Sequence, residues 1–328
     1  MVMIVYKIKY NEIPKLKPMS AAIGFFDGFH KGHEQLIAAA ISEAKKNHLK
    51  SAVITFAPDP WTVFKPDANR DHLLSDEEKE QFCKNLGIDE MIIIEFTREF
   101  AALSPGQFNE MLVKLNVKYL VCGFDFTYGY KGLGNPQTLK EQDAFHVEVI
   151  SSVNDEDGKI SSSRIESLIR QGEVSKAASL LGYIYSVNGK VVHGFKRGSS
   201  LLGFPTANIE TPAGIVLPEL GVYTGMAAVD GILYPAMINV GYNPTFDNHS
   251  ISIEGNLLDF HQDLYGKIVR FFFVSRIRPE IRFNNLDELI TQLESDQKAV
   301  KPALAKEKAL IRATGSLWSL KDSFVIIG

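Results

Sequence analysis

Two patterns of hydrophobic and polar positions divide the chain. In the first half, short continuous apolar runs alternate with stretches in which apolar residues recur every three or four positions. Continuous apolar runs are typical of strands in a parallel sheet covered on both faces. Apolar residues that recur every three or four positions are typical of helices. Together they predict a doubly wound α/β domain, which binds ligands beyond the carboxyl ends of its strands. The predicted strands are 20–24, 51–56, 91–96, 118–123 and 145–150, and the predicted helices are 34–48, 76–86 and 107–115.

The pattern changes near Leu181, where short strands follow one another with turn residues between them. Such closely spaced strands predict a small antiparallel β-barrel, with a helix at 286–293 and more helix to about Ala313. We therefore expect an α/β domain at 1–160, a helical connection at 161–182 and a barrel domain at 183–328. The predicted barrel strands are 183–187, 190–193, 222–229, 233–240, 250–258 and 267–274.

Composition narrows the class of protein. The chain has 328 residues, 45% of them hydrophobic and 23% charged, with a net charge of −4, so it can fill two cores and shows no sign of disorder. The two cysteines, Cys83 and Cys122, are expected to be buried thiols in a reducing compartment. Residues 1–16 alternate apolar and charged positions, which predicts a strand rather than a signal peptide. We expect a soluble, cytoplasmic protein that binds neither nucleic acid nor membrane and has no obligate protein partner.

The first chemical motif follows the first predicted core strand and precedes a helix. Glycines let backbone approach a ligand, and the free amides at a helix start favour phosphate. His30 and His33 are three residues apart, so their imidazoles share one face of the first turn and can donate hydrogen bonds to phosphate. The plainer alternative is a pair of surface histidines in a glycine-rich turn. The motif reads Gly24-Phe-Phe26-Asp27-Gly28-Phe-His30-Lys-Gly-His33.

This string resembles the Gly-x-Phe-Asp-Gly-x-His-x-Gly-His signature of the nucleotidyltransferase superfamily. With the segments 56–60, 96–103 and 123–129, it is similar to the adenylyltransferase module of bacterial bifunctional riboflavin kinase/FMN adenylyltransferases. The resemblance implies catalytic roles for His30 and His33 and a flavin-binding role for Phe56 and Pro58. The alternative for 123–129 alone is an aromatic turn after a strand. The nucleotide-binding residues implied are Gly24, Phe26, Asp27, Gly28, Asp125, Ser162 and Ser163.

A third motif of that module departs from the family. The family's Ile-Ser-Ser-Thr-x-x-Arg is similar to residues 160–166 here, but serine replaces threonine at Ser163 and glutamate replaces arginine at Glu166. A cation facing phosphates is thereby replaced by an anion, which predicts slower or tuned adenylyl transfer. Two alternatives stay open: Ser163 and Glu166 have the spacing of a capping box, and Arg164 or Arg170 could supply the cation.

The second half carries a different motif, Gly203-Phe-Pro205-Thr206-Ala-Asn208. Thr206 and Asn208 are two apart on an extended chain, so both side chains point the same way and offer oxygen ligands for Mg²⁺. A turn capped by threonine and asparagine is the alternative. The motif resembles the Gly-x-Pro-Thr-Ala-Asn signature of riboflavin kinases.

That resemblance extends through residues 221–225, 239–246, 253–260, 263–266 and 278–280 and to Phe283. It implies that Glu254 is the general base for the 5′-hydroxyl of riboflavin, although alone Glu254 could be an exposed strand carboxylate. It also implies that Gly198, Gly203 and Pro205 contact nucleotide and that Arg278 and Glu280 contact flavin. Between Gly198 and Gly203 the family's arginine is missing and one residue is inserted, which puts nucleotide affinity in question.

The sequence therefore predicts a transferase that uses ATP and Mg²⁺ to convert riboflavin to FMN and FMN to FAD. One alternative is a riboflavin kinase with an impaired adenylyltransferase module. Another is a flavin- or nucleotide-binding regulator, which the retained base Glu254 disfavours. An aminoacyl-tRNA synthetase, which shares a His-x-Gly-His theme, is disfavoured by the chain length and by the lack of a basic region.

Overall fold

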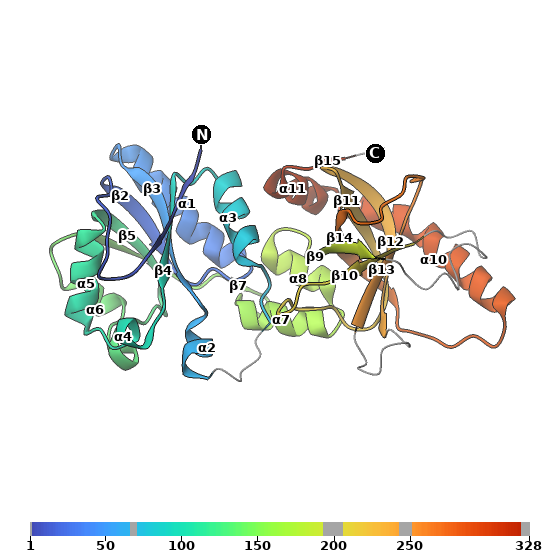
Figure 1. Cartoon of the computed structure of the whole chain (residues 1–328), viewed down its shortest axis with the longest axis horizontal. Coiled ribbons are helices and arrows are strands. Elements are labelled where there is room, and N and C mark those ends of the chain that lie inside the picture. Colours follow the sequence, from blue (N-terminus) through green and yellow to red (C-terminus); the bar gives the residue numbers. More distant parts are fainter. Residues whose placement is uncertain (1, 66–70, 193–205, 243–250, 323–328) are drawn as a thin grey trace. The chain divides into compact units, whose positions relative to one another are not determined.

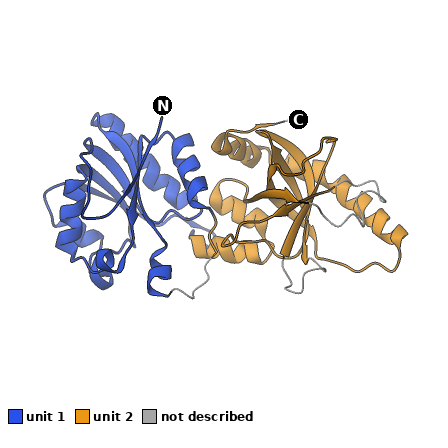
Figure 2. Cartoon of the chain, viewed as in Figure 1, with its two compact units in different colours: residues 1–70, 74–161 blue, residues 71–73, 162–328 orange. Residues whose placement is uncertain are grey.

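The computed structural model describes residues 2–65, 71–192, 206–242 and 251–322 (Figure 1). The chain forms two compact units, shown in Figure 2. The first contains Met1–Arg70 and Leu74–Ser161, and the second contains Asp71–Leu73 and Ser162–Gly328. The helix pair predicted as a connection belongs to the second unit.

The first unit is built on a six-stranded sheet in the order β1-β4-β3-β2-β5-β6, with every pair parallel. Figure 1 shows α1 and α3 on one face and α5 and α6 on the other, which confirms the doubly wound arrangement. The strands are β1 (Ile4–Ile8), β2 (Met19–Ile23), β3 (Lys50–Ala57), β4 (Glu90–Glu95), β5 (Val117–Gly123) and β6 (His146–Ile150). The helices are α1 (Lys31–Lys46), α2 (Pro60–Phe64), α3 (Asp76–Asn85), α4 (Arg98–Ala101), α5 (Pro105–Lys114) and α6 (Pro136–Lys140).

The buried strands explain why this sheet could be predicted. All five residues of β2 are buried, and the core packs Ile23, Ile54 and Leu120 against Phe108 and Leu112 of α5. The prediction of one N-terminal strand over 1–16 was wrong in extent, because β1 ends at Ile8. The chain turns after Ile8, where the amide of Glu12 donates to the carbonyl oxygen of Lys9 at 3.1 Å, and Pro14 lacks the amide hydrogen that a longer strand would need. A short hairpin, β7 (Asn154–Asp155) and β8 (Gly158–Lys159), completes the unit.

The second unit is a closed six-stranded antiparallel barrel, as predicted. The order is β11-β14-β9-β10-β13-β12, and pairing of β11 with β12 closes the barrel. A two-residue strand, β15 (Lys321–Asp322), pairs with β12 outside the ring. The strands are β9 (Ser186–Val192), β10 (Ala207–Glu210), β11 (Gly221–Val229), β12 (Ile232–Tyr242), β13 (Ile251–Leu257) and β14 (Ile268–Arg278). The helices are α7 (Ser162–Arg170), α8 (Val174–Leu181), α10 (Leu286–Lys306) and α11 (Lys308–Trp318).

Two details of the barrel differ from the prediction. The strands predicted at 183–187 and 190–193 are the single strand β9, because Gly189 is a close-packing position and not a turn. A Cβ at Gly189 would lie 2.3 Å from the carbonyl oxygen of Glu210, so glycine lets β10 approach. The strand β10 was not among the predicted strands, although the Thr206-to-Asn208 motif that overlaps it was expected to be extended.

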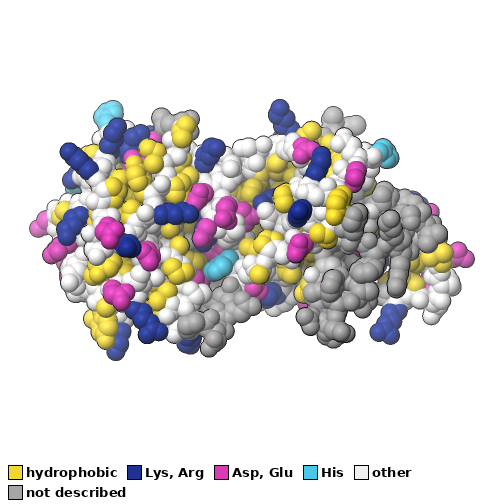
Figure 3. Space-filling view, in the orientation of Figure 1, with side chains coloured by type: hydrophobic (Ala, Val, Ile, Leu, Met, Phe, Trp, Pro, Cys, Tyr) yellow, Lys and Arg dark blue, Asp and Glu magenta, His cyan; other side chains and the backbone are white. Residues whose placement is uncertain are grey.

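Charge and hydropathy agree with a folded protein. On the face drawn in Figure 3, lysine and arginine side chains are interspersed with aspartate and glutamate. Among the described residues, no helix combines the length and the apolar character that a membrane crossing requires. Cys83 and Cys122 are both free and buried, and burial raises the pKa of the two thiols to about 12 and about 11.

Candidate active sites

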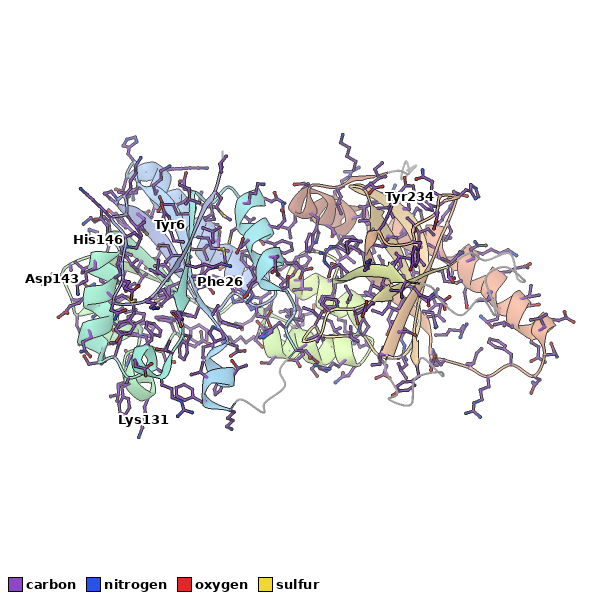
Figure 4. All side chains as sticks on the ribbon, in the orientation of Figure 1. Tyr6, Phe26, Lys131, Asp143, His146 and Tyr234 are labelled. Carbon is purple, nitrogen blue, oxygen red and sulfur yellow. The ribbon has the colours of Figure 1, made fainter. Side chains whose placement is uncertain are left out.

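The loop between β2 and α1 has an unusual backbone. Phe26, Gly28 and Phe29 have φ angles of 52°, 79° and 40°, in the left-handed region that non-glycine residues rarely adopt. Phe26, labelled in Figure 4, is nevertheless buried, and its ring lies edge-on to His33 at 5.2 Å between centroids. Gly24 starts the loop and donates its amide to the carbonyl oxygen of Ile54 at 3.1 Å. Such strain, held in place by core packing, is common at functional sites.

His30 and His33 do lie together, as the spacing predicted. Their rings stack with centroids 3.7 Å apart and planes 15° apart. His30 is the N-cap of α1, and its Nδ1 accepts hydrogen bonds from the amides of Gly32 at 3.1 Å and His33 at 3.3 Å. An acceptor nitrogen carries no proton, so the proton of neutral His30 is on Nε2. The loop therefore offers one imidazole N–H of known identity at a helix N-terminus.

Both imidazoles are neutral at pH 7. Burial lowers the pKa of His30 to about 4, although the carboxylates of Asp27 and Asp125 act in the opposite direction. Burial also lowers the pKa of His33 well below 6.5, and the neighbouring His30, Lys79 and Lys159 lower it further. Within the described residues, the enclosed Nδ1 of His33 has no hydrogen-bond partner. Neutral imidazoles stabilise phosphate charge as hydrogen-bond donors and not as cations.

The lowered pKa of His30 makes stability depend on pH. The imidazole of His30 has a pKa of 6.5 in the unfolded chain and of about 4 in the folded chain. The free energy of unfolding therefore falls as the pH drops from 6.5 towards 4. His30→Asn keeps a good N-cap and cannot titrate. Between pH 7.5 and pH 5, this variant should lose on the order of 2 kcal/mol less unfolding free energy than the wild type. Urea unfolding followed by Trp61 fluorescence in a Trp318→Phe background reports the first unit, and equal losses in both proteins would contradict the assignment.

Two carboxylates adjoin this loop through different partners. The Oδ1 of Asp27 accepts the amide of Leu74 at 3.3 Å. Asp125 forms an ion pair with Lys159 at 2.5 Å, and the ammonium of Lys159 lies 4.8 Å from the ring centre of Phe124. Sequence reasoning did not identify Lys159, although its position directly before the 160–166 motif was a usable signal.

Phe56 lies near the carboxyl end of β3 and Pro58 follows that strand, beside a group of aromatic rings. The ring of Phe56 lies 6.2 Å from that of Phe96 and 5.7 Å from that of Phe100. Pro58 is exposed and follows a cis peptide bond. Phe64 of α2 is exposed and contacts Phe96 at 6.2 Å. These rings provide flat apolar surface of the kind that ring ligands bind.

The 160–166 motif crosses the unit boundary: Ile160 and Ser161 end the first unit, and Ser162 begins α7 in the second. The helix begins at Ser162, so Ser163 is inside the helix and the capping-box alternative is wrong. The Oε1 of Glu166 accepts instead from Nε of Arg170 at 3.0 Å. Arg170 also donates to Asp71 at 2.6 Å, and these contacts, that to Asp71 first, raise its pKa. Arg170 is thus already engaged by two carboxylates.

A cavity of about 540 Å³ lies in the second unit, on the outer face of the barrel beside α10. Its lining includes the polar residues Thr206 and Glu254 and the apolar residues Met237, Leu289 and Leu293. The remaining lining residues are Val222, Asn239, Asn256, Arg278, Glu280, Ile281, Arg282 and Phe283.

Barrel register brings the predicted kinase residues together. Asn208 of β10 and Asn239 of β12 both lie directly opposite Glu254 of β13. The hydroxyl of Thr206 donates to Oε1 of Glu254, and Nδ2 of Asn208 donates to the same oxygen at 3.3 Å. Residues opposite one another on neighbouring strands share a face, so one row of side chains crosses three strands.

The donor set fits Mg²⁺. Magnesium prefers oxygen ligands and retains several waters. The hydroxyl of Thr206 and the amide oxygen of Asn208 provide such ligands, and both side chains contact the carboxylate of Glu254. Among the described residues, no cluster of three histidine, cysteine, aspartate or glutamate side chains competes as a metal site.

Arg278 and Glu280 line the same cavity. Two nitrogens of Arg278, Nε and Nη2, contact Oδ2 of the buried Asp296 at 2.9 and 2.8 Å. Asp296 also accepts from Gln292 at 2.8 Å, so α10 fixes the guanidinium. The predicted nucleotide contacts Gly198, Gly203 and Pro205 lie outside the described residues. Sequence reasoning gave no role to Asn239, Asn256 or the apolar lining from α10, because barrel closure and helix packing bring these residues together.

The two sites define the class of protein: a nucleotide-dependent transferase with a nucleotidyltransferase unit and a separate kinase barrel. The family model for FAD synthetase matches residues 12–164, and the model for riboflavin kinase matches residues 181–304. The chain belongs to the bifunctional riboflavin kinase/FMN adenylyltransferase family.

Individual relatives agree over most of the chain. The bifunctional riboflavin kinase/FMN adenylyltransferase of Listeria monocytogenes is 39% identical to this chain. The match covers 87% of this chain and 92% of the Listeria enzyme. The enzyme of the same name from Bacillus subtilis is 38% identical, and the match covers 85% of this chain and 91% of that enzyme. A crystal structure named macrolide-efflux protein from Streptococcus pneumoniae matches this chain with a TM-score of 0.85 and 34% identity. The match covers 91% of this chain and 99% of that protein's chain. That name describes transport for that protein, whereas the family models and the two named relatives agree on flavin chemistry.

Proposed function

We infer that this enzyme phosphorylates riboflavin to FMN and adenylylates FMN to FAD, with ATP and Mg²⁺ in both steps. The single observation that carries the kinase assignment is the meeting of Thr206, Asn208 and Glu254, of which Thr206 and Glu254 line a cavity of about 540 Å³. We assign adenylyl transfer to residues 1–160 and phosphorylation to 183–328, joined by 161–182. Free, buried cysteines and the use of ATP support a cytoplasmic location.

In the kinase step, Glu254 is placed to take the proton of the 5′-hydroxyl of riboflavin. The hydroxyl oxygen bonds to the γ-phosphorus of ATP, the bond to the β-phosphate oxygen breaks, and ADP leaves. Mg²⁺ held by Thr206 and Asn208 would neutralise phosphate charge. The contacts from Thr206 and Asn208 fix one carboxylate oxygen of Glu254, which orients the base before substrate binds.

In the adenylyl step, a phosphate oxygen of FMN attacks the α-phosphorus of ATP, and pyrophosphate leaves. We assign phosphate binding to the loop from Gly24 to Gly28, whose backbone precedes the amino end of α1. The Nε2 proton of His30 and the N–H of His33 stabilise the charge that develops on the transferred group. Asp125 completes the proposed nucleotide contacts of this unit, and Phe56 and Pro58 provide the proposed flavin contacts. Ser162 and Ser163, which the family resemblance implies as further nucleotide contacts, belong to the second unit.

One assay tests the assignment. Purified protein is incubated with riboflavin, ATP and Mg²⁺, and FMN and FAD are separated by chromatography. Formation of both products is expected. FMN without FAD would instead support a kinase with an impaired adenylyltransferase module, and no product would support a binding protein.

We propose that Glu166 slows adenylyl transfer, because the family has arginine at this position. Glu166→Arg should raise the rate of FAD formation about tenfold, since a cation replaces an anion near phosphates. The change also sets two arginines one helical turn apart, at a cost of a few tenths of a kcal/mol. The matched variant Glu166→Gln separates loss of the negative charge from gain of a positive one. An unchanged or lower rate in folded Glu166→Arg would contradict the proposal.

A further inference from the structure

A further cavity lies in the first unit, at the end of the sheet opposite the loop from Gly24 to Gly28. Its volume is about 600 Å³, which is in the range of small-molecule sites. It forms where β5 and β6 begin, between the end of α1 and the loop that follows α6. The glycine loop follows the carboxyl end of β2, and the two ends of the parallel, seven-residue β5 lie about 20 Å apart. The two proposed reactions therefore do not use this cavity.

Two stacked aromatic rings are part of the lining of this cavity. Tyr119 of β5 and His146 of β6 are partners in the parallel pairing of these strands, so their side chains lie on the same face of the sheet. Their ring centroids are 4.8 Å apart and their planes differ by 23°. Tyr119 is half-buried, whereas His146, labelled in Figure 4, is exposed. The imidazole therefore keeps an open face on which a further flat ring can stack.

Hydrogen bonds within the chain hold these rings and the neighbouring loop in place. The hydroxyl of Tyr119 donates to Oδ1 of Asn47, the C-cap of α1, at 3.2 Å. In the loop before β6, Nε2 of Gln142 donates to the carbonyl oxygens of Leu139 and Phe145 at 2.9 and 2.8 Å. Its Oε1 accepts from the amide of Phe145 at 3.1 Å. A site whose walls are already ordered loses little conformational entropy when a ligand binds.

Two lysines give the lining an excess of positive charge. Lys118 near the start of β5 and Lys140 at the end of α6 are both exposed and both line the cavity. Within the part of the chain that the structure describes, neither ammonium group takes part in an ion pair. Asp143 is the one carboxylate among the described lining residues. The lysines favour an anionic ligand, and Asp143 can accept hydrogen bonds from its hydroxyl or amino groups.

We propose that this cavity is a separate binding site for a mononucleotide, whose base stacks on His146 and whose phosphate is bound by Lys118 and Lys140. Any base can stack on an aromatic side chain through its flat face, and ammonium groups are strong hydrogen-bond donors to phosphate. A phosphate alone would leave the rings unused, and an uncharged ring would leave the lysines unused. The combination therefore favours a ligand that carries both groups, and a nucleotide bound here is an effector and not a substrate.

The experiment follows the imidazole of His146 by proton NMR in the full chain at constant pH, with AMP as the probe. The chain has 8 histidines, and the signal of His146 is the one that His146→Gln removes. AMP should shift this signal upfield until the site is saturated, because a stacked base shields the imidazole protons. Replacing Lys118 and Lys140 together with alanine should raise the Kd for AMP about tenfold, since both charged contacts to phosphate are lost. The remaining histidine signals show whether each variant is folded.

The matched control is Lys114→Ala, because Lys114 is exposed at the end of α5 and does not line the cavity. It should leave the Kd for AMP unchanged. Adenosine and inorganic phosphate, each in competition with AMP, test the ring and the anion separately, and each should bind at least about tenfold more weakly than AMP. A His146 signal that AMP does not shift, a Kd that the two lysines do not affect, or equal binding of AMP and either fragment would overturn the proposal.

Discussion

Replacing Glu254 with glutamine should lower the rate of riboflavin phosphorylation about a thousandfold, within the range attributed to a positioned general base. Glutamine keeps the size of the side chain and an oxygen that can accept from Thr206 and Asn208. The expected loss therefore reflects removal of the base and not collapse of the row across β10, β13 and β12. FMN formation is measured from riboflavin, and FAD formation is measured separately from supplied FMN.

The second reaction serves as the control within the same chain. Glu254 belongs to the second unit, whereas the loop from Gly24 to His33 belongs to the first. Adenylylation of supplied FMN by Glu254→Gln should remain within about twofold of the wild type, since substitutions at independent sites without shared partners rarely couple. A parallel loss of both reactions would contradict the assignment of separate sites.

Much of the fold could be predicted because local pattern and tertiary structure agree. The buried strands of the first unit are continuous apolar runs, and the structure places β2 to β6 within one residue of the predicted bounds. The helices start at recognisable caps such as Ser75 and Ser104, each with a complete capping box. Errors arose where a glycine serves close packing, as Gly189 does, or where a strand is as short as β10.

The site residues also fall into two groups: those close together in the sequence could be predicted, and those brought together only by the fold could not. His30, His33, Thr206 and Asn208 could be found because each pair lies within one turn or one strand. Asn239 could not be found, because its place directly opposite Glu254 depends on barrel register. The lowered pKa values of the two histidines depend on burial, which the exposed appearance of a His-x-Gly-His string conceals.

Replacing His33 with alanine should lower FAD formation from FMN about 100- to 1,000-fold, as expected for loss of one donor to a developing anion. The stacked partner, His30, keeps its place because backbone amides hold its Nδ1. Riboflavin phosphorylation by the same protein, measured in parallel, should be unchanged and shows that the chain is folded. Equal damage to both reactions would contradict the role.

A pH profile then separates hydrogen bonding from charge at this site. Because burial lowers the pKa of His33 well below 6.5 and that of His30 to about 4, both imidazoles stay neutral from pH 8 to pH 6. The rate of wild-type FAD formation should therefore show no imidazole titration in that range, once the ionisation of FMN itself is allowed for. A step near pH 7 that disappears in His33→Ala would mean that a charged imidazole takes part, and the neutral-donor mechanism would be wrong.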